Sequence, residues 1–438
     1  MLRTIFVLLI TAYGGFQALK GPFEALLFYL WIAYFRPDQW VWDSSLLYAL
    51  QLSFWSGIYF ILRALPSIGQ ARFDLRAMIF IGFLILSCLS AWASDHPVAW
   101  LRWQDFAKTL VVAFFLYALL NDDIKKFRLT VLVIAVSLGF EAVKQGYASL
   151  ITNPGGLNQN LLAQLGDNNG VAVGMVMLVA LFIALSRTTE NKRERQIYLF
   201  FMLGIVYRAV TTYSRGGFLS IAALTLMYVA RSNQKLKAVL GALLVAGIIV
   251  PVLPPAFWQR MATMNVRSED DMDASSASRL HFWRVAVLMA QDHPLLGIGY
   301  NSFNEHFDQY DFSVGFYGVD RSVHSMWFGV LAELGYLGLV MFIMMFMLAL
   351  TGMHRVASLA RRGYLPPEFY QYAVALQAAF VACMVGGTFL PWQYTEMLWH
   401  FFALSMALRQ IALKSAKAPE AEAAAAAPEP FSVARRTA

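Results

Sequence analysis

Long apolar segments alternate with short polar links along almost the whole chain. Four of them, at 197–212, 218–230, 239–252 and 326–350, are nearly free of charged residues. A membrane crossing needs about 20 predominantly apolar residues, and fewer where flanking polar side chains reach back to the interface. The pattern predicts an all-α polytopic membrane protein with about 12 transmembrane helices, forming one transmembrane domain over residues 1–415.

The basic residues between these segments predict the orientation of the chain. Lys and Arg gather in alternate links, at 63–76, 121–128, 187–196, 231–237 and 353–365. Cytoplasmic links carry an excess of Lys and Arg, so these links and the C-terminus are expected on the cytoplasmic side. The intervening links, including the long segment 256–322, are then expected outside. Residues 1–35 count as one crossing, interrupted by a helix break at Lys20-Gly21-Pro22.

The segment 256–322 is the longest polar stretch and carries nine acidic against five basic residues. Its many aromatic residues argue against disorder, and long loops in compact proteins are usually functional. We expect it to fold back onto the membrane surface as one large, partly helical periplasmic loop. By contrast, the Ala-, Glu- and Pro-rich tail 416–438 is expected to be a disordered cytoplasmic extension.

The clearest element of this loop is a helix over 279–289. Three serines before or at its start are candidate N-caps: Ser275, Ser276 and Ser278. Leu280, Trp283 and Val287 fall on one face at helical spacing, which predicts a short amphipathic helix at the membrane surface.

The composition agrees with a membrane protein. Hydrophobic residues make up 59% of the chain and charged residues 14%, whereas soluble domains carry about 25% charged residues. The net charge of +7 resides mainly in the cytoplasmic links, so it indicates topology and no nucleic-acid partner. Cys88 and Cys383 both lie inside apolar runs, which argues against a disulfide framework or a cysteine metal site.

A tight turn, Ser214-Arg215-Gly216-Gly217, opens the apolar run 218–230 on the predicted outer side. A helix N-terminus presents free N–H groups and a positive dipole, which favour an anion. The glycines let a ligand approach the backbone, and Arg215 offers a guanidinium fork to a phosphate. We therefore expect Ser214, Gly216 and Gly217 to contact an anionic substrate beside Arg215. A surface arginine that reaches lipid headgroups fits the local sequence equally well.

Arg279 occupies the first turn of the predicted loop helix. A cation there opposes the helix dipole, and the conflict is relieved if an anion lies between them. Taken alone, a solvated loop charge is the simpler interpretation. Arg284 lies five positions further on and points elsewhere, so it ranks below Arg279 as a substrate-binding candidate.

His324 lies at the start of the apolar run 326–350, with Ser322 as the expected N-cap. The helix dipole would lower the pKa of the imidazole and keep it neutral, able to accept a proton. Eleven residues, about three turns, separate His324 from Gly335, so the two are expected on one face. Gly335 and Gly338 would let another helix pack there and place His324 in a cleft. The alternative is a helix-end histidine bonded to water.

Three further basic residues are secondary candidates for binding phosphate: Arg321, Lys108 and Arg102. Each could equally contact lipid headgroups. The pair Glu141 and Lys144, one helical turn apart in an apolar run, is expected to neutralise itself, although intramembrane charges also mark transport pathways. The acidic run 269–273 contains an Asp-x-Asp pattern, Asp271 and Asp273, for which a solvated loop is favoured over a metal site.

Together, these motifs resemble the signatures of bacterial O-antigen ligases. His324-Ser325, nine residues and then Gly335 look like the His-[Asn/Ser/Gln]-x9-Gly signature. Arg215 and Leu219 look like the Arg-x3-Leu motif of the same family. The order of many helices and one long outer loop before the histidine is also similar.

The resemblance covers residues 160–400 and extends to the loop arginine of the wider ligase and polymerase superfamily. Arg279 lies where those proteins carry it, ahead of a Pro-Leu-Leu-Gly-Ile-Gly turn at 294–299. The N-terminal third resembles the family only in hydropathy.

The resemblance implies a GT-C-like glycosyltransferase of the bacterial inner membrane that needs neither metal nor cofactor. Its donor would be a glycan on undecaprenyl pyrophosphate, and its acceptor a lipid A–core sugar at the periplasmic face. Arg215 and Arg279 would stabilise the pyrophosphate, and His324 would act as general base. An O-antigen polymerase or a protein O-oligosaccharyltransferase with the same donor remains open. A lipid-linked sugar transporter is disfavoured, because the sequence has no internal repeat.

Overall fold

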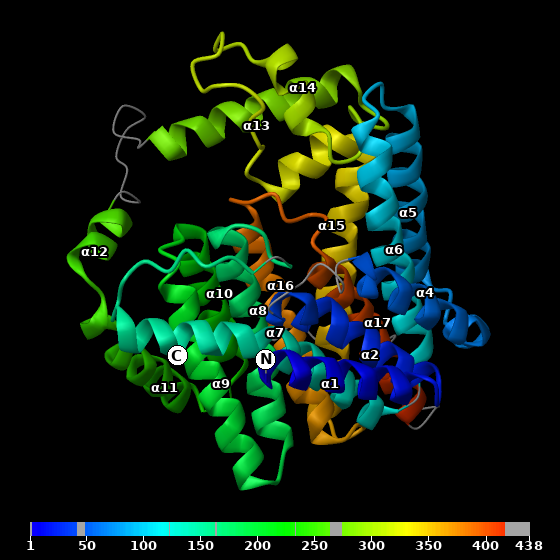
Figure 1. The fold of residues 1–438 in the computed structure, drawn as a ribbon, viewed down its shortest axis with the longest axis vertical. Helices are drawn as coiled ribbons and strands as arrows, with labels where there is room; N and C mark the ends of the chain where they lie inside the picture. The colour runs from blue at the N-terminus through cyan, green and yellow to red at the C-terminus, as the bar shows by residue number, and fades with distance from the viewer. Residues whose placement is uncertain are drawn as a thin grey trace, which may run out of the picture.

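A computed structural model describes residues 2–41, 49–121, 123–162, 164–232, 234–262 and 274–416. In these ranges the chain forms α-helices and short 3-10 helices, without β-strands. Figure 1 shows their arrangement around a long axis. The acidic run 269–273 and the tail 417–438 lie outside the described residues.

The N-terminal part of the described chain forms α1 (Leu2–Ala18), α2 (Pro22–Phe35), α4 (Leu52–Ala64), α5 (Leu75–Ala93), α6 (Val98–Leu119), α7 (Ile124–Thr152) and α8 (Asn168–Thr188). The C-terminal part forms α9 (Lys192–Val210), α10 (Arg215–Arg231), α11 (Lys235–Ile249), α12 (Pro255–Ala262), α13 (Ala274–Asp292), α14 (Phe303–Tyr310), α15 (Met326–Arg361), α16 (Pro367–Gly387) and α17 (Glu396–Ser415). The 3-10 segments are η1 (Pro37–Trp40), η2 (Leu65–Gln70) and η3 (Val250–Val252).

Five helices of the described chain are long and apolar enough to cross a membrane. They are α5, α8, α15, α16 and the stretch Lys235–Val252, in which η3 continues α11. This agrees with a multi-pass helical membrane protein, whereas the figure of about 12 crossings stays a prediction. The break in the first 35 residues is confirmed: α1 ends at Ala18, and α2 begins at Pro22, whose ring suits the first helical position.

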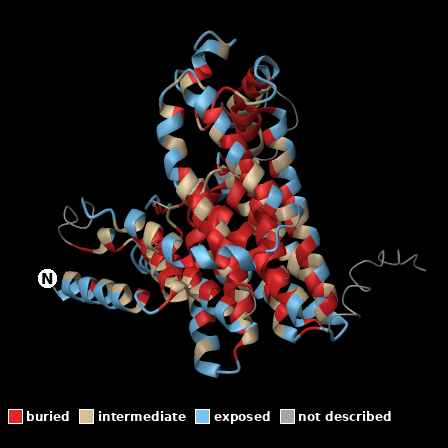
Figure 2. Cartoon of the chain, turned by 90° about the vertical axis from the view of Figure 1, so that its right-hand side faces the viewer, coloured by how far each residue is buried: buried red, intermediate tan, exposed pale blue. Residues whose placement is uncertain are grey.

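The centre of the bundle consists of α8, α16 and α17, most of whose residues are buried. Figure 2 shows this centre in red, while α1, beside the N-terminus, extends sideways with a mostly exposed surface. Trp399 of α17 is fully buried and packs against the rings of Phe80, Phe83 and Phe106. These contacts join α17 to α5 and α6, so the central helices are surrounded on several sides.

The loop expected over 256–322 is partly helical where the structure describes it. In Figure 1, α13 and α14 lie at the top of the molecule, beside the upper ends of α5 and α6. The loop is held there by its own small core, which contains Phe282 and Met289 of α13 and Phe303 and Phe307 of α14. The predicted loop therefore covers one end of the bundle.

The prediction for the loop helix was wrong at its start and in its buried face. The helix begins at Ala274, so the three candidate serines lie inside it and Arg279 lies in its second turn. The buried face is formed by Phe282, Val285, Ala286 and Met289, whereas Leu280, Trp283 and Val287 are only half-buried. The helix packs against α15 rather than lying alone on a surface, and packing against a neighbour decides which face is covered.

Candidate active site

The first part of the site is the N-terminus of α10, which begins at Arg215, three residues before the predicted apolar run. Ser214 is the N-cap, and its hydroxyl accepts a hydrogen bond of 3.1 Å from the Gly217 N–H. The same hydroxyl donates to Asn169 Oδ1 at 2.8 Å, which ties this turn to the first turn of α8. Ser214 is buried and Arg215 is half-buried. Arg215 is thus presented from a rigid helix start.

The two glycines of this turn pack between helices. A Cβ at Gly217 would lie 2.5 Å from the Cβ of Ala172 in α8. A Cβ at Gly216 would lie 3.6 Å from the carbonyl oxygen of Gly386 in α16. The structure therefore explains Gly217 by close helix packing, and ligand binding by either glycine stays a prediction.

The expected position of His324 in the first turn of α15 was wrong. Ser325, in an extended conformation, is the N-cap, its hydroxyl accepts from the Phe328 N–H at 3.5 Å, and the helix begins at Met326. His324 immediately precedes the cap with a φ of 47°, a left-handed conformation that an α-helix cannot continue. Its imidazole is therefore positioned by the loop and not by the helix.

Burial and neighbouring charges lower the pKa of His324 below its ordinary value of 6.5. Burial contributes most, since it disfavours the imidazolium. The positive charges of Arg279 and Arg321 lower the pKa further, while Asp167 opposes them. The pKa of His324 is shifted in the expected direction, but the causes are burial and the charge of Arg279 instead of the helix dipole. The structure thus brings His324 and Arg279 together.

Asp167 was not among the expected site residues. It caps α8, where its carboxylate accepts from the Gly170 N–H at 2.9 Å. Two residues later, Asn169 accepts the hydrogen bond from Ser214. Asp167 therefore acts on His324 from the same turn that holds the start of α10. A polar Asp-Asn-Asn sequence before an apolar run was the available signal, as a helix start.

Aromatic side chains complete the connection between α13 and α10. Trp283 of α13 stacks on Phe328 of α15 with ring centroids 5.0 Å apart, and its ring centroid lies 6.4 Å from that of Phe389. Phe389 in turn lies against Gly216 of α10. One end of the bundle thus brings together the starts of α8, α10 and α15 and the face of α13 that carries Trp283.

The loop around His324 is held by a hydrogen bond of 2.7 Å between His281 Nε2 and the Asp311 carboxylate. Burial disfavours the charged form of Asp311, but hydrogen bonds from Ser313, Gly315 and His281 outweigh it and lower its pKa to about 2. Next in sequence, Phe282 lies with its ring centroid 6.1 Å from that of His324. The segment carrying the imidazole therefore rests on a folded platform.

Gly335 serves a different purpose from the one predicted. It has a φ of 68° and breaks α15 into two parts, so His324 and Gly335 do not share a helix face. The Tyr336 N–H donates to the carbonyl oxygen of Pro294 at 2.9 Å, and a Cβ at Gly335 would lie 2.5 Å from that oxygen. The Ile298 N–H likewise donates to the carbonyl of Ala332. The glycine admits the 294–299 turn, not another helix.

Glu333 is a second residue that the sequence reasoning missed. Its side chain is buried, and its two oxygens accept from the Phe303 N–H at 3.3 Å and from Gln393 Nε2 at 3.1 Å. It therefore joins the loop, α15 and the link before α17. A carboxylate inside an apolar run was the signal, because such residues rarely lie there without a partner.

The secondary candidates differ in position and in partners, and Lys108 lies in the middle of α6 rather than at this end. Arg102 of α6 forms an ion pair of 2.7 Å with Glu305 and donates to the Asn301 carbonyl, so it anchors the loop. Arg321 is exposed and donates to the Tyr317 carbonyl. Arg284 is exposed on α13, and Lys108 lies beside Gly57 of α4. Of these, Arg321 acts on His324 through its charge.

The predicted neutralisation of Glu141 and Lys144 is confirmed by an ion pair of 2.9 Å. The nearby Arg208 of α9, not singled out from the sequence, is completely buried. Its guanidinium donates to Gln145 Oε1 at 2.9 Å and to the Asn158 carbonyl at 3.3 Å. These charges hold α7, α9 and the link before α8 together rather than forming a central pathway.

No group of three or more His, Cys, Asp or Glu side chains in the described part of the chain is placed to hold a metal ion. The acidic run 269–273 is not in that part. Metal independence therefore stays a prediction.

Comparison with known families agrees with this geometry. Residues 197–343 match the family described as O-antigen ligase, a stretch that runs from α9 into α15 and contains Arg215, Arg279 and His324. This match supports a relationship of this part of the chain to the O-antigen ligase/polymerase superfamily. Residues 1–188 match a family of unknown function, DUF5935. The search of curated proteins gives no match. The O-antigen ligase match implies a glycosyltransferase-like activity of the O-antigen ligase/polymerase type.

Proposed function

We propose that this protein transfers a completed glycan from undecaprenyl pyrophosphate to a sugar hydroxyl of lipid A–core. The reaction would take place at the periplasmic face of the inner membrane, without a cofactor. The observation that carries this proposal is that Arg279 lies close enough to His324 for its charge to lower the pKa of the imidazole, at the end of the bundle where α10 presents Arg215. The family match supports the reaction class.

Each residue has a role that the chemistry requires. The acceptor oxygen attacks the anomeric carbon of the donor sugar, and its proton passes to the unprotonated imidazole of His324. The bond between that carbon and the pyrophosphate oxygen breaks, and undecaprenyl pyrophosphate leaves with the electron pair. Arg215 and Arg279 stabilise the charge that develops on the leaving group. Arg279 has a second role, since its charge keeps His324 neutral before the reaction.

The orientation follows from the charge pattern. The links rich in Lys and Arg lie at the opposite ends of the helices from α13 and α14, and by the positive-inside rule this supports a periplasmic site. An O-antigen polymerase or a protein O-oligosaccharyltransferase would use the same donor and leaving-group contacts. The acceptor alone separates these activities.

The test is glycan transfer by purified full-length protein in detergent. The donor is undecaprenyl-pyrophosphate-linked glycan, the acceptor is rough lipopolysaccharide, and EDTA is present without nucleotide. We expect glycan-capped lipopolysaccharide from the wild type, and a loss of about 100- to 10,000-fold in His324→Ala. The matched control is His293→Ala, an exposed histidine of the same loop, which should retain transfer.

The other outcomes separate the alternatives. Transfer only to a second lipid-linked glycan or to a peptide would replace the ligase assignment by one of its relatives. Restoration by a divalent cation would contradict metal independence. Full activity of His324→Ala would remove the imidazole from the mechanism.

A further inference from the structure

Four arginines gather at the end of the bundle away from α13 and α14. Arg72 and Arg76 lie at the start of α5, Arg355 near the end of α15 and Arg409 near the end of α17. The other end of α5 is followed by Ser94, whose hydroxyl donates to Ile298 in the loop. The 19 residues of α5 rise about 28 Å, so the cluster is well separated from the proposed active site.

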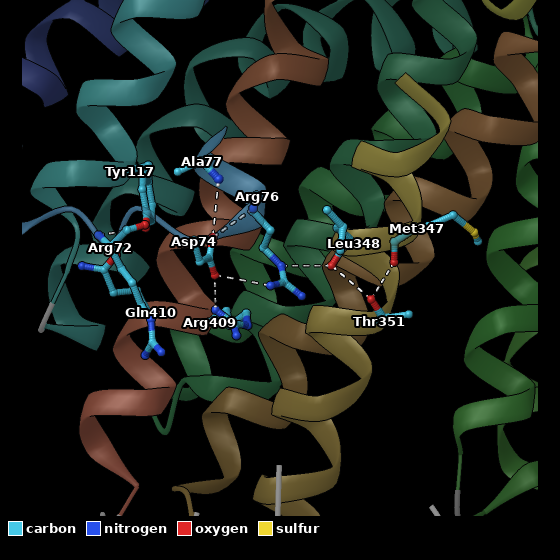
Figure 3. Close-up of polar contacts among 10 residues, drawn as sticks. All are labelled: Arg72, Asp74, Arg76, Ala77, Tyr117, Met347, Leu348, Thr351, Arg409 and Gln410. Carbon is cyan, nitrogen blue, oxygen red and sulfur yellow. Dashed lines mark hydrogen bonds and ion pairs between the residues drawn. The ribbon is translucent and has the colours of Figure 1, made fainter. Parts of the chain in front are cut away.

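The carboxylate of Asp74 lies between the guanidinium groups of Arg76 and Arg409, as Figure 3 shows. Asp74 is the N-cap of α5 and accepts from the N–H groups of Arg76 and Ala77. It also pairs with Arg409 at 2.7 Å and with Arg76 at 3.4 Å. Asp74 is therefore already shared between a helix start and two arginines.

The remaining positive charge is not neutralised by this carboxylate. Arg76 Nε donates to the carbonyl of Leu348 at 3.3 Å, which holds its guanidinium against α15. Arg355 is close enough to repel both Arg76 and Arg409, and Arg72 also repels Arg409. Arg72 and Arg355 are exposed. The cluster thus contains four guanidinium groups and one carboxylate, and the side chains of two of the arginines are exposed.

The backbone holds Arg72 firmly despite its exposed side chain. Its N–H donates to the Tyr117 hydroxyl at 3.1 Å, and that hydroxyl donates to the Arg72 carbonyl at 2.6 Å. Gln410 of α17 contributes a further contact to the same N–H. Three helices, α5, α6 and α17, therefore position one edge of the cluster.

A small pocket with mainly apolar walls adjoins the cluster between α5, α15 and α17. Arg76 lies at its margin, and its apolar lining includes Phe80, Met345, Leu348, Phe402 and Met406. A cationic edge next to an apolar wall matches a molecule with an anionic head and an apolar chain. A free anion would gain no favourable contact from the apolar wall.

We propose that this cluster binds the phosphodiester headgroup of an anionic membrane phospholipid, with the first chain methylenes against the pocket. Arginine recognises phosphate through a planar fork, and basic pockets between transmembrane helices bind anionic headgroups. The links that carry Arg72 and Arg355 are those expected at the cytoplasmic leaflet, where anionic lipids attract basic residues. The inference does not depend on glycan transfer.

The experiment measures lipid binding to the purified full-length protein by native mass spectrometry in detergent. Phosphatidylglycerol and phosphatidylethanolamine are titrated separately, because they differ in headgroup charge. We expect tighter binding of phosphatidylglycerol, reduced about 5-fold by Arg72→Gln or Arg355→Gln and about 30-fold by the double variant. Both side chains are exposed, so the variants should fold, which thermal unfolding checks.

Arg362→Gln is the matched control, because Arg362 is an exposed arginine at the end of α15 outside the cluster. It should leave phosphatidylglycerol binding unchanged. Equal binding of both lipids by the wild type, or an equal loss in Arg362→Gln, would overturn the proposal. A further arm adds inorganic phosphate: if it displaces the lipid at similar concentrations, the cluster is a site for free anions and the lipid assignment is wrong.

Discussion

Two helices, α10 and α15, each begin at a serine N-cap beside a candidate catalytic residue, but the residues lie on different sides of the cap. Arg215 is the first residue of α10, directly after Ser214. His324 is the last residue before Ser325, which caps α15. Arg215 therefore belongs to a helix start, with its N–H groups and dipole, whereas His324 belongs to a loop with a left-handed backbone.

The difference teaches how each residue acquires its chemistry. A cation at a helix N-terminus can join the backbone N–H groups in binding a phosphate, and local sequence suffices to specify it. The imidazole depends on what covers it, because burial and Arg279 lower its pKa. The two sequence patterns are similar, but they act differently. The environment of Arg215 is determined by its own helix, whereas the pKa of His324 is determined by a distant segment.

Apart from His324→Ala, the largest expected effect tests the helix-start residue. Arg215→Ala should reduce kcat/KM for glycan transfer about 100- to 1,000-fold, since leaving-group stabilisation is lost. Arg215→Lys should recover only part of it, because an ammonium lacks the planar fork. The measurement is the transfer assay with protein amount in the membrane as a check on folding. A wild-type rate of transfer in Arg215→Ala would show that the reaction does not need the arginine at the start of α10.

The next effect tests the loop side, through Gly335. Gly335→Ala should destabilise the protein by about 2–4 kcal/mol, because alanine is strained at positive φ and its Cβ would meet the Pro294 carbonyl. Thermal unfolding of purified protein measures this. Gly241→Ala in α11, where a Cβ meets nothing within 4 Å, should be neutral or slightly stabilising. Equal stability of the two variants would mean that the 294–299 turn does not require the glycine.

The two caps can be compared directly. Ser214→Ala should cost about 1–2 kcal/mol and Ser325→Ala about 0.5–1 kcal/mol. The Ser214 hydroxyl makes the shorter cap bond and also donates to Asn169. The Ser325 hydroxyl accepts a longer hydrogen bond from the Phe328 N–H. The same unfolding assay ranks them. A larger loss at Ser325 would show that the start of α15 is held mainly by its cap.

The smallest effect is a displacement of the pH profile. Because the pKa of His324 is lowered from 6.5, protonation of the base, and with it the acid limb of kcat/KM, should fall at a pH below that value. Arg279→Gln removes a repelling cation, so the pKa should rise and the limb move to higher pH. Asp167→Asn removes an attracting carboxylate and should move it to lower pH.

The two opposite displacements check each other. Arg284→Gln, on the exposed side of α13, should leave the position of the limb unchanged. If Arg279→Gln and Asp167→Asn moved the limb in the same direction, the electrostatic account of His324 would be wrong.

Much of the fold could be predicted from hydrophobicity alone. The apolar runs became helices, the break before Pro22 appeared where expected, and the long polar segment folded over one end of the bundle. The helix start at Arg215 was also predictable, because Ser214 and the following apolar run are local signals. The start of α15 was not, since Ser322 and Ser325 are both possible caps and only the path of the loop selects between them.

The arrangement of the candidate site residues could not be predicted from the sequence. Asp167 and Glu333 were missed because their roles depend on contacts with segments far away in sequence. Gly335 was identified as a site of close packing, but the expected neighbour, another helix, was wrong. Nothing in the local sequence indicates that Pro294 approaches this glycine.

The sequence by itself determined that this is a helical membrane protein, which end of each helix carries positive charge, and which motifs place it near O-antigen ligases. These properties depend on local composition and on spacings of a few turns. The tertiary structure alone decided that His324 lies outside its helix, that Arg279 acts on it, and that Gly335 receives the loop. Each of these depends on burial and on charges brought together from distant segments, and neither quantity is defined until the chain has folded.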